Sequence, residues 1–235
     1  MLFYDKKGYP VEFKNYEYLD RGNCAKVYIK ENVALKVFDC NSKAIMRKDL
    51  FQILKYSNLE NLIKLYDYYY SFKLFPILRK FIAMDSYTME YIDEERESLI
   101  FASSEYIEKI SEQLEVLLQK LSERRIVIND AHYGNIIFGK SGVTIIDPDH
   151  FYISNDHSIS EIISKNREEA IKYLNDTIEN EMYNSNLIDI YNIRLDRYVF
   201  IDNIDYSKSL VDIVRNNMGE ENISKEYIKK YERYF

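Results

Sequence analysis

Cysteine, proline and glycine are scarce in this chain of 235 residues, and each shortage excludes a class of protein. With only two cysteines, Cys24 and Cys40, the chain can build neither a disulfide framework nor a four-cysteine zinc site, and this usage is typical of a reducing compartment. Three prolines and six glycines leave no flexible linker, and the sequence contains neither an internal repeat nor a low-complexity tract. A chain of this length is compatible with one compact domain or with two small lobes.

Long apolar runs and an excess of positive charge are also missing. The chain lacks any run of about 18 apolar residues, and Met1–Lys7 lacks the basic and apolar regions of a signal peptide. The 32 Lys and Arg residues are outnumbered by 39 Asp and Glu residues, and the net charge of −7 argues against a nucleic-acid-binding surface. We therefore expect a cytoplasmic protein that binds neither a membrane nor nucleic acid.

The most informative stretch is a short β-hairpin that the sequence predicts in the middle of the chain. Two β-branched runs, Ile136–Phe138 and Val143–Ile146, flank the turn Gly139–Gly142. Polar residues stand at both open ends of this hairpin, where antiparallel pairing brings them side by side. They are Asp130 and Asn135 before the first strand, and Asp147 and Asp149 after the second. Carboxylate and amide oxygens of this kind suit a hard cation such as Mg²⁺.

Alternation of apolar and polar residues predicts an antiparallel sheet in the first part of the chain. Its first two strands lie within Tyr16–Lys30, and Val33–Phe38 forms the third. Further strands are predicted at Leu62–Tyr70 and Tyr87–Asp93, whereas Ser71–Asp85 is compatible with a helix or a strand.

Apolar residues at helical spacing predict helices in the rest of the chain. The clearest is Glu105–Arg125, where one apolar stripe is surrounded by Glu, Gln and Lys. Other helices are predicted at Asn41–Tyr56, Ser158–Tyr173, Leu187–Tyr198, Ser209–Asn217 and Lys225–Phe235.

Together these motifs resemble those of the protein-kinase-like superfamily. The sequence D-A-H-Y-G-N at Asp130–Asn135, followed by Asp147, is similar to its catalytic loop and metal-binding aspartate. V-A-L-K-V-F at Val33–Phe38 is similar to its lysine strand, and T-M-E-Y-I at Thr88–Ile92 is similar to its hinge. The resemblance spans essentially the whole chain and implies an α+β, bilobal protein-kinase-like fold. It divides the chain into a small antiparallel-sheet N-lobe, residues 1–90, and a mostly helical C-lobe, residues 91–235.

The resemblance also implies a role for each candidate site residue. Asp130 would orient the acceptor hydroxyl and accept its proton, while Asn135 and Asp147 would hold Mg²⁺. Lys36 would hold the phosphates of ATP between the lobes, and Asp49 would pair with it in place of the family's helix glutamate. The remaining ATP-binding residues would be Gly22, Val27, Ala34, Met89, Glu90 and Ile92, the last two through their main chain.

The chain departs from the family's pattern at several places. Only Gly22 remains of the three glycines in the phosphate-binding loop, and the first helix contains no glutamate. Ile128 and Asn129 replace the His-Arg that precedes the catalytic aspartate in protein kinases. With His132 and Gly134, the loop is most similar to those of the sugar, choline and antibiotic kinase branches. His132 would either help to orient a phosphate or metal, or cap local backbone groups.

The function that the resemblance implies is transfer of the γ-phosphate of ATP to a hydroxyl of a small molecule or a protein, with Mg²⁺ as cofactor. Two alternatives stay open at this point. The chain could be a pseudokinase that binds nucleotide or acts as a scaffold without chemistry, or it could transfer a nucleotidyl group on the same fold. The sequence identifies neither the acceptor nor the oligomeric state.

Overall fold

The computed structural model describes residues 2–22, 24–39, 46–75, 80–99, 102–184 and 204–217. The chain divides into two compact units. The first consists of Met1–Leu59 and Ile63–Asp93, and the second of Glu60–Leu62 and Glu94–Phe235.

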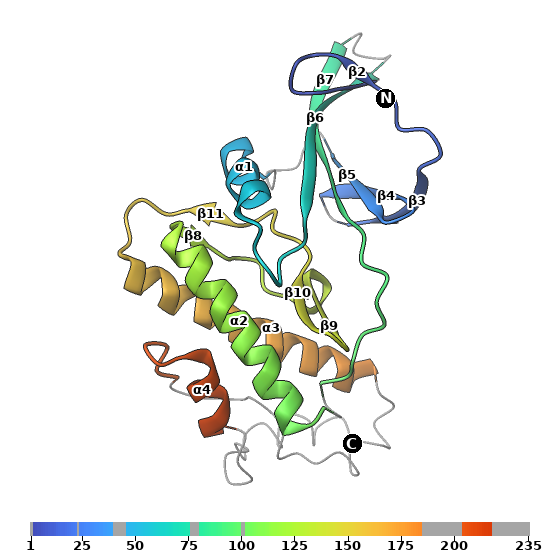
Figure 1. Ribbon diagram of the computed structural model, residues 1–235. Helices are drawn as coiled ribbons and strands as arrows, with labels where there is room; N and C mark the ends of the chain where they lie inside the picture. The colour runs from blue at the N-terminus through green and yellow to red at the C-terminus, as the bar shows by residue number, and fades with distance from the viewer. Residues whose placement is uncertain are drawn as a thin grey trace. The chain divides into compact units, whose positions relative to one another are not determined.

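The first unit is built on one antiparallel sheet of seven strands in the order β2-β1-β6-β7-β5-β4-β3 (Figure 1). The strands are β1 (Leu2–Tyr4), β2 (Pro10–Val11), β3 (Glu17–Arg21), β4 (Ala25–Lys30), β5 (Val33–Phe38), β6 (Leu65–Phe75) and β7 (Lys80–Glu90). The three predicted strands that precede residue 40 are confirmed as β3, β4 and β5. The open question of Ser71–Asp85 is also answered, since β6 and β7 are two long strands of one hairpin.

The two faces of β5 are buried in different ways because successive side chains on a strand point to opposite sides. On one face, Leu35 and Val37 pack against partly buried aromatic residues that include Phe13. On the other face, the rings of Phe38 and Tyr87 lie 5.8 Å apart, and Phe51 of the helix α1 lies 5.7 Å from Tyr87. β5 is therefore a buried central strand, on which a side chain has little freedom to move.

Helix α1 (Lys48–Ser57) begins later than the sequence predicted. The prediction of Asn41–Tyr56 was wrong at its start, because Met46 and Arg47 are not helical; residues 40–45 lie outside the described part of the chain. Arg47 is the N-cap, with an extended backbone at ψ 138°, and its guanidinium bonds the carboxylate of Asp49 in the first turn. Met46 is buried although it is not helical, so its apolar side chain extended the helical pattern past the true start.

The second unit is mostly helical. It contains α2 (Ser104–Glu123), β8 (Ile126–Val127), the 3₁₀ turn η1 (Tyr133–Asn135), β9 (Ile136–Gly139), β10 (Gly142–Ile145), β11 (Tyr152–Ile153), α3 (Ile159–Asn184) and α4 (Leu210–Asn217). The prediction of α2 is confirmed: Ser103 caps it by accepting from the N–H of Tyr106, and its apolar stripe is buried. α3 is longer than predicted, and α4 agrees with the prediction. The helices predicted at Leu187–Tyr198 and Lys225–Phe235 lie outside the described residues.

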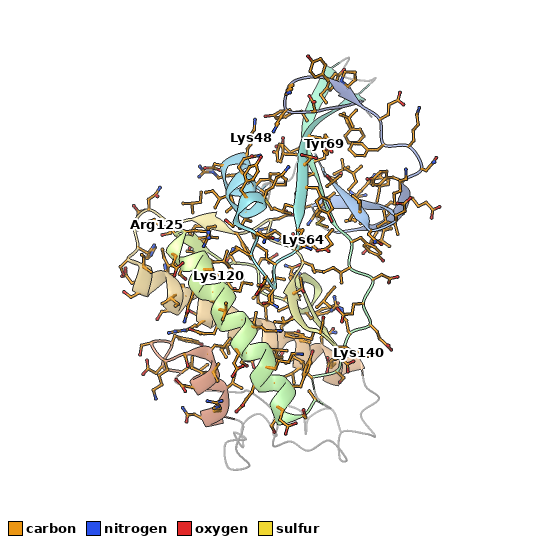
Figure 2. The ribbon with its side chains drawn as sticks, in the orientation of Figure 1. Lys48, Lys64, Tyr69, Lys120, Arg125 and Lys140 are labelled. Carbon is orange, nitrogen blue, oxygen red and sulfur yellow. The ribbon has the colours of Figure 1, made fainter. Side chains whose placement is uncertain are left out.

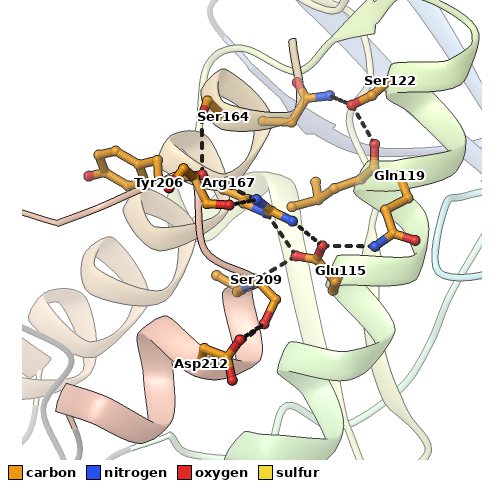
Figure 3. A network of polar contacts seen from close by, with 12 residues as sticks. Glu115, Gln119, Ser122, Ser164, Arg167, Tyr206, Ser209 and Asp212 are labelled. Atoms are coloured by element: carbon orange, nitrogen blue, oxygen red, sulfur yellow. Dashed lines mark hydrogen bonds and ion pairs between the residues drawn. The ribbon is translucent and has the colours of Figure 1, made fainter. Parts of the chain in front are cut away.

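A buried ion pair joins α2, α3 and α4 (Figure 3). The Arg167 guanidinium on α3 bonds both oxygens of Glu115 on α2, at 3.1 and 2.6 Å. Its remaining nitrogen donates to the carbonyls of Tyr206 and Ser207, just before α4. Glu115 also accepts from Gln119 and from the N–H of Leu210, so the pair is surrounded by bonding partners. This network fixes the helices that carry the rest of the unit.

The α+β class predicted from the sequence is confirmed, with an antiparallel sheet first and helices later. Within the described ranges, every helix is too short or too polar to span a bilayer.

Candidate active site

The predicted hairpin is confirmed and gathers the polar residues at its open end. β9 and β10 pair antiparallel with Ile136 opposite Ile145, and the pairing continues because the N–H of Ile146 donates to the carbonyl of Asn135 at 2.9 Å. The other edge of β10 is bound by Asn61, which accepts from the N–H of Ile145 and donates to the carbonyl of Val143. Asn135 and Asp147 therefore stand at the same end of a hairpin that is fixed along both edges of β10.

Asp130 is held in an unusual backbone conformation. Its φ is +66°, in the left-handed region that aspartate tolerates better than most residues. The side-chain amide of Asn135 donates both to the Asp130 carbonyl, at 2.8 Å, and to carboxylate oxygen Oδ2, at 3.2 Å. Asn135 therefore binds both the backbone and the carboxylate of Asp130.

Two histidines lie next to the same carboxylate oxygen. The Nε2 of His150 is 3.5 Å from Oδ2 of Asp130, and the Nε2 of His132 is 4.0 Å from it. The Nδ1 of His132 accepts from the N–H of Gly134 at 3.0 Å, so His132 caps local backbone, one of the two roles considered for it from the sequence. A Cβ added at Gly134 would lie 2.7 Å from the His132 ring, so only glycine fits beside this cap.

The irregular loop that carries Asp130 is bonded along its length to side chains of α3. Asn166 accepts from the N–H of Ile128 at 2.9 Å and donates to the carbonyl of Ile126. Glu169 accepts from the N–H of Ala131, and Asp176 accepts from the N–H of Tyr133 at 2.6 Å. Backbone donors that no regular strand satisfies are thereby paired, as burial demands. α3 therefore supports the loop.

Directly after α2, Arg125 bonds a different segment, the chain that follows β11; its side chain is labelled in Figure 2. Its backbone is left-handed, with φ +60°, and its guanidinium donates to the carbonyls of Ser154, Asn155 and His157. These bonds hold the chain that follows β11, whose pairing with β8 places Tyr152 opposite Val127.

Tyr173, on the same side of α3, contributes a buried hydroxyl that has no hydrogen-bond partner among the described residues. Burial raises the pKa of Tyr173, and the negative charges of Asp147, Glu169 and Asp130 raise it further. Burial and three nearby carboxylates therefore keep the Tyr173 hydroxyl protonated.

The residues here fit a divalent cation. Because Asn135 uses its nitrogen on Asp130, its Oδ1 is the end that can bind a metal, and Asp147 is partly buried after β10. The N–H of Asp149 donates to Oδ1 of Asp147 at 3.3 Å. Within the described ranges, no three His, Cys, Asp or Glu side chains form a metal cluster. Two protein ligands are what Mg²⁺ commonly uses when substrate phosphates and water complete its shell.

In the first unit, four predicted ATP-binding residues share one face of the sheet. Lys36 pairs across the strands with Val27 on β4 and Tyr87 on β7, and Ala34 pairs with Met89. Residues paired in this way project to the same side, and residues two apart on a strand do so too. Lys36 is 8% exposed, and its Nζ lies 5.8 Å from the centre of the Phe38 ring.

The other predicted nucleotide-binding residues in the first unit lie in the β3–β4 turn and at the end of β7. Gly22 closes the β3–β4 turn through its N–H, which donates to the carbonyl of Ala25, and an added Cβ would meet nothing nearer than 3.9 Å. The N–H of Glu90 is taken by the carbonyl of Lys64, so only the Glu90 carbonyl could serve a ligand, while Ile92 follows β7 outside the sheet.

Asp49 bonds a residue other than the one predicted for it. Its two carboxylate oxygens accept from Arg47, at 3.1 and 2.6 Å, and Oδ1 also accepts from the N–H of Leu50. The pairing of Asp49 with Lys36 stays a prediction.

Sequence reasoning missed the residues of α3 and His150. Asn166, Glu169, Tyr173 and Asp176 recur at helical spacing, so a polar stripe on an otherwise apolar helix side was the signal available. For His150 no sequence signal existed, because its approach to Asp130 depends on how the loop and the turn after β10 fold.

The elements described are an antiparallel sheet that buries Lys36 and a mostly helical unit that carries Asp130, Asn135 and Asp147. In a comparison with solved structures, the chain is similar to aminoglycoside phosphotransferase APH(2'')-Ib in its ADP-bound form. The TM-score is 0.46 at 13% identity, over 90% of this chain and 95% of that one. This likeness concerns the fold alone. No family model matches the chain, and no curated protein sequence matches it either.

Proposed function

We propose that this protein is an ATP-dependent phosphotransferase that moves the γ-phosphate of ATP onto a hydroxyl of a small molecule or a protein. The observation that carries the proposal is the state of the Asp130 carboxylate. Asn135 donates to Oδ2, the Nε2 atoms of His150 and His132 lie 3.5 and 4.0 Å from the same oxygen, and Oδ1 accepts no hydrogen bond from the described residues. One oxygen is held while the other stays open, as a base that must meet an acceptor hydroxyl requires.

In the proposed reaction, the acceptor oxygen forms a bond to the γ-phosphorus and its proton passes to Oδ1 of Asp130. The bond between that phosphorus and the β–γ bridging oxygen breaks, and ADP leaves. Asn135 and Asp147 would hold Mg²⁺, which when bound neutralises charge on the phosphates. Lys36 would contribute a fixed positive charge to the phosphates, and the main chain of Glu90 and Ile92 would hold the adenine. Most of the rate enhancement would come from positioning and charge neutralisation.

The direct test is to follow labelled phosphate. The full chain is incubated with Mg²⁺ and with ATP labelled at the γ or the α position. Sugars, amino alcohols and a cell extract serve as acceptors, and the extract is afterwards separated into small molecules and proteins. We expect γ label in one acceptor fraction and no transfer of α label. Transfer of α label would replace the proposal by nucleotidyl transfer.

Matched variants separate catalysis from binding. Asp130→Asn should lower transfer by about 10²- to 10⁴-fold, the usual contribution of a general base, while ATP binding measured by calorimetry is retained. Asp156→Asn, in an exposed turn of the same unit, serves as the control and should leave transfer unchanged. Mg²⁺-dependent ATP binding without transfer to any fraction would instead support a pseudokinase.

A further inference from the structure

His150 lies in the turn that follows Asp147-Pro148-Asp149, and its ring reaches back to the catalytic loop. The turn is closed by the N–H of Phe151, which donates to the carbonyl of Pro148 at 3.1 Å. The His150 side chain is 33% exposed, and its Nε2 lies 3.5 Å from Oδ2 of Asp130. This contact connects the segment after β10, where the metal-binding aspartate stands, with the loop that carries the base.

One hydrogen-bond donor and two histidine nitrogens lie around the same oxygen of Asp130. Asn135 donates to Oδ2 at 3.2 Å, His150 lies 3.5 Å from it and His132 lies 4.0 Å from it. A carboxylate without such neighbours rotates between two equivalent orientations and presents either oxygen. The bond from Asn135, together with a histidine close to the same oxygen, would restrict that rotation, and fixed geometry of this kind lowers the barrier of a transfer step.

The two histidines are not equivalent in this arrangement. His132 belongs to the loop itself, and its Nδ1 is committed to the N–H of Gly134, so it is part of the local backbone cap. His150 comes from a different segment. Its Nε2 lies 3.5 Å from Oδ2 of Asp130, whereas the Nε2 of His132 lies 4.0 Å from it. Its ring can therefore fix the position of Asp130 relative to the metal-binding end of the hairpin, which His132 cannot do.

We infer that His150 is a positioning residue for Asp130, which holds Oδ2 so that Oδ1 faces the acceptor hydroxyl. The inference rests on the proposed function, because it concerns the same carboxylate. His150 touches neither ATP nor the acceptor in this role. Its removal should therefore slow the transfer step without weakening nucleotide binding.

The kinetic test compares two substitutions of His150 with a matched histidine elsewhere. His150→Ala should lower kcat by about 10- to 100-fold, as loss of an orienting partner commonly does, and change the KM for ATP by less than about twofold. His150→Gln keeps an N–H donor near the place of Nε2 and should recover most of kcat. His157→Gln is the control, because His157 bonds Ser154 and Lys165 instead. Unchanged kcat in His150→Ala, or equal losses in the Ala and Gln variants with a raised KM, would overturn the inference.

A second measurement tests the contact without any activity. The chain contains three histidines, so their ring nitrogens can be followed individually by ¹⁵N NMR. Asp130→Asn should shift the Nε2 signal of His150 and leave that of His157 in place. If the wild-type chain transfers no phosphate and this shift is seen, the proposed function fails while the contact stands. If the His150 signals are the same in both proteins, the positioning role fails whatever the activity.

Discussion

α3 carries two polar networks on two of its sides, and they differ in how completely their groups are paired. On one side, Arg167 and Glu115 bond each other. Glu115 accepts further bonds from Gln119 and the N–H of Leu210, and Arg167 donates to two backbone carbonyls. On the other side, Asn166, Glu169 and Asp176 bond the loop that carries Asp130, while the hydroxyl of Tyr173 has no partner within the described residues. We call the first network closed, because the Glu115 carboxylate and the Arg167 guanidinium are both paired, and the second open, because it contains an unpaired hydroxyl.

The difference distinguishes a network that holds helices together from one that includes residues of the proposed site. Buried polar groups are nearly always paired, so an unpaired group in a native fold calls for an explanation. The closed network stabilises the packing of three helices and offers nothing to a ligand. The open network contains a half-exposed carboxylate and a buried, unpaired hydroxyl, and an unpaired buried polar group costs stability. Four predictions test this contrast, beginning with the largest effect.

Breaking the closed network should cost the most stability. Glu115→Ala leaves the Arg167 charge buried and unpaired, so we expect a loss of about 3–5 kcal/mol in the free energy of unfolding, measured by urea denaturation. Replacing both partners, as in Glu115→Leu with Arg167→Met, should recover much of that loss because no charge is left unpaired. A loss below about 1 kcal/mol in the single variant would show that the pair is not buried in solution.

Low pH neutralises the negative charge of Glu115 without removing its side chain. Burial by itself would raise the pKa of Glu115, but bonds from Arg167, the Leu210 N–H and Gln119 outweigh it, and the pKa is below its ordinary value of 4.5. A carboxylate with a lowered folded pKa adds stability above its unfolded pKa, and that stability is lost as pH falls through the folded value. The free energy of unfolding should therefore fall as the pH drops below 4.5, and fall less steeply in Glu115→Gln, the control. Parallel pH profiles of the two proteins would contradict this.

In the open network, loss of a side chain that bonds the Asp130 loop should lower stability by less than loss of Glu115 does. Asp176→Ala removes the acceptor of the Tyr133 N–H, and we expect a loss of about 1 kcal/mol together with slower transfer. Asp176→Asn keeps an acceptor at the same place and should behave like the wild type in both assays. Equal behaviour of the Ala and Asn variants would show that the bond does not hold the loop.

The smallest effect, and the one with the opposite sign, is expected at Tyr173. Tyr173→Phe removes a buried hydroxyl that has no partner within the described chain, so stability should rise by about 1 kcal/mol. Differential scanning calorimetry without and with Mg²⁺ and ATP measures this. Tyr106→Phe is the control, because the Tyr106 hydroxyl donates to the Gly139 carbonyl and its loss should destabilise. Destabilisation by Tyr173→Phe would mean that the hydroxyl does have a partner.

Elements with a strong local pattern were predictable from the sequence. The hairpin β9–β10 follows from two β-branched runs around a glycine-containing turn, and α2 follows from its apolar stripe and its serine cap. The start of α1 was predicted wrongly, because the buried Met46 continues the helical spacing without being helical. The length of β6 and β7 was not predictable, since a run of tyrosines shows no clear period.

The candidate site was predictable only as far as its motif extends. Asp130 and Asn135 were placed together correctly by the hairpin, and their contact follows from the loop spacing. The supports from α3 are 38 to 43 residues away in sequence, and a polar residue within a helix usually faces solvent. Contacts of this range arise from tertiary packing, which no local pattern encodes.

The left-handed backbone at Asp130 limits how this position can change in evolution. Asparagine and glycine tolerate such a conformation, yet neither can take up a proton from an alcohol. Glutamate retains the acid but is poorly suited to the backbone and carries it one methylene further out. In the proposed reaction, the proton-accepting role of Asp130 would thus be lost through a single substitution that leaves the protein folded, and only a return to aspartate would restore it.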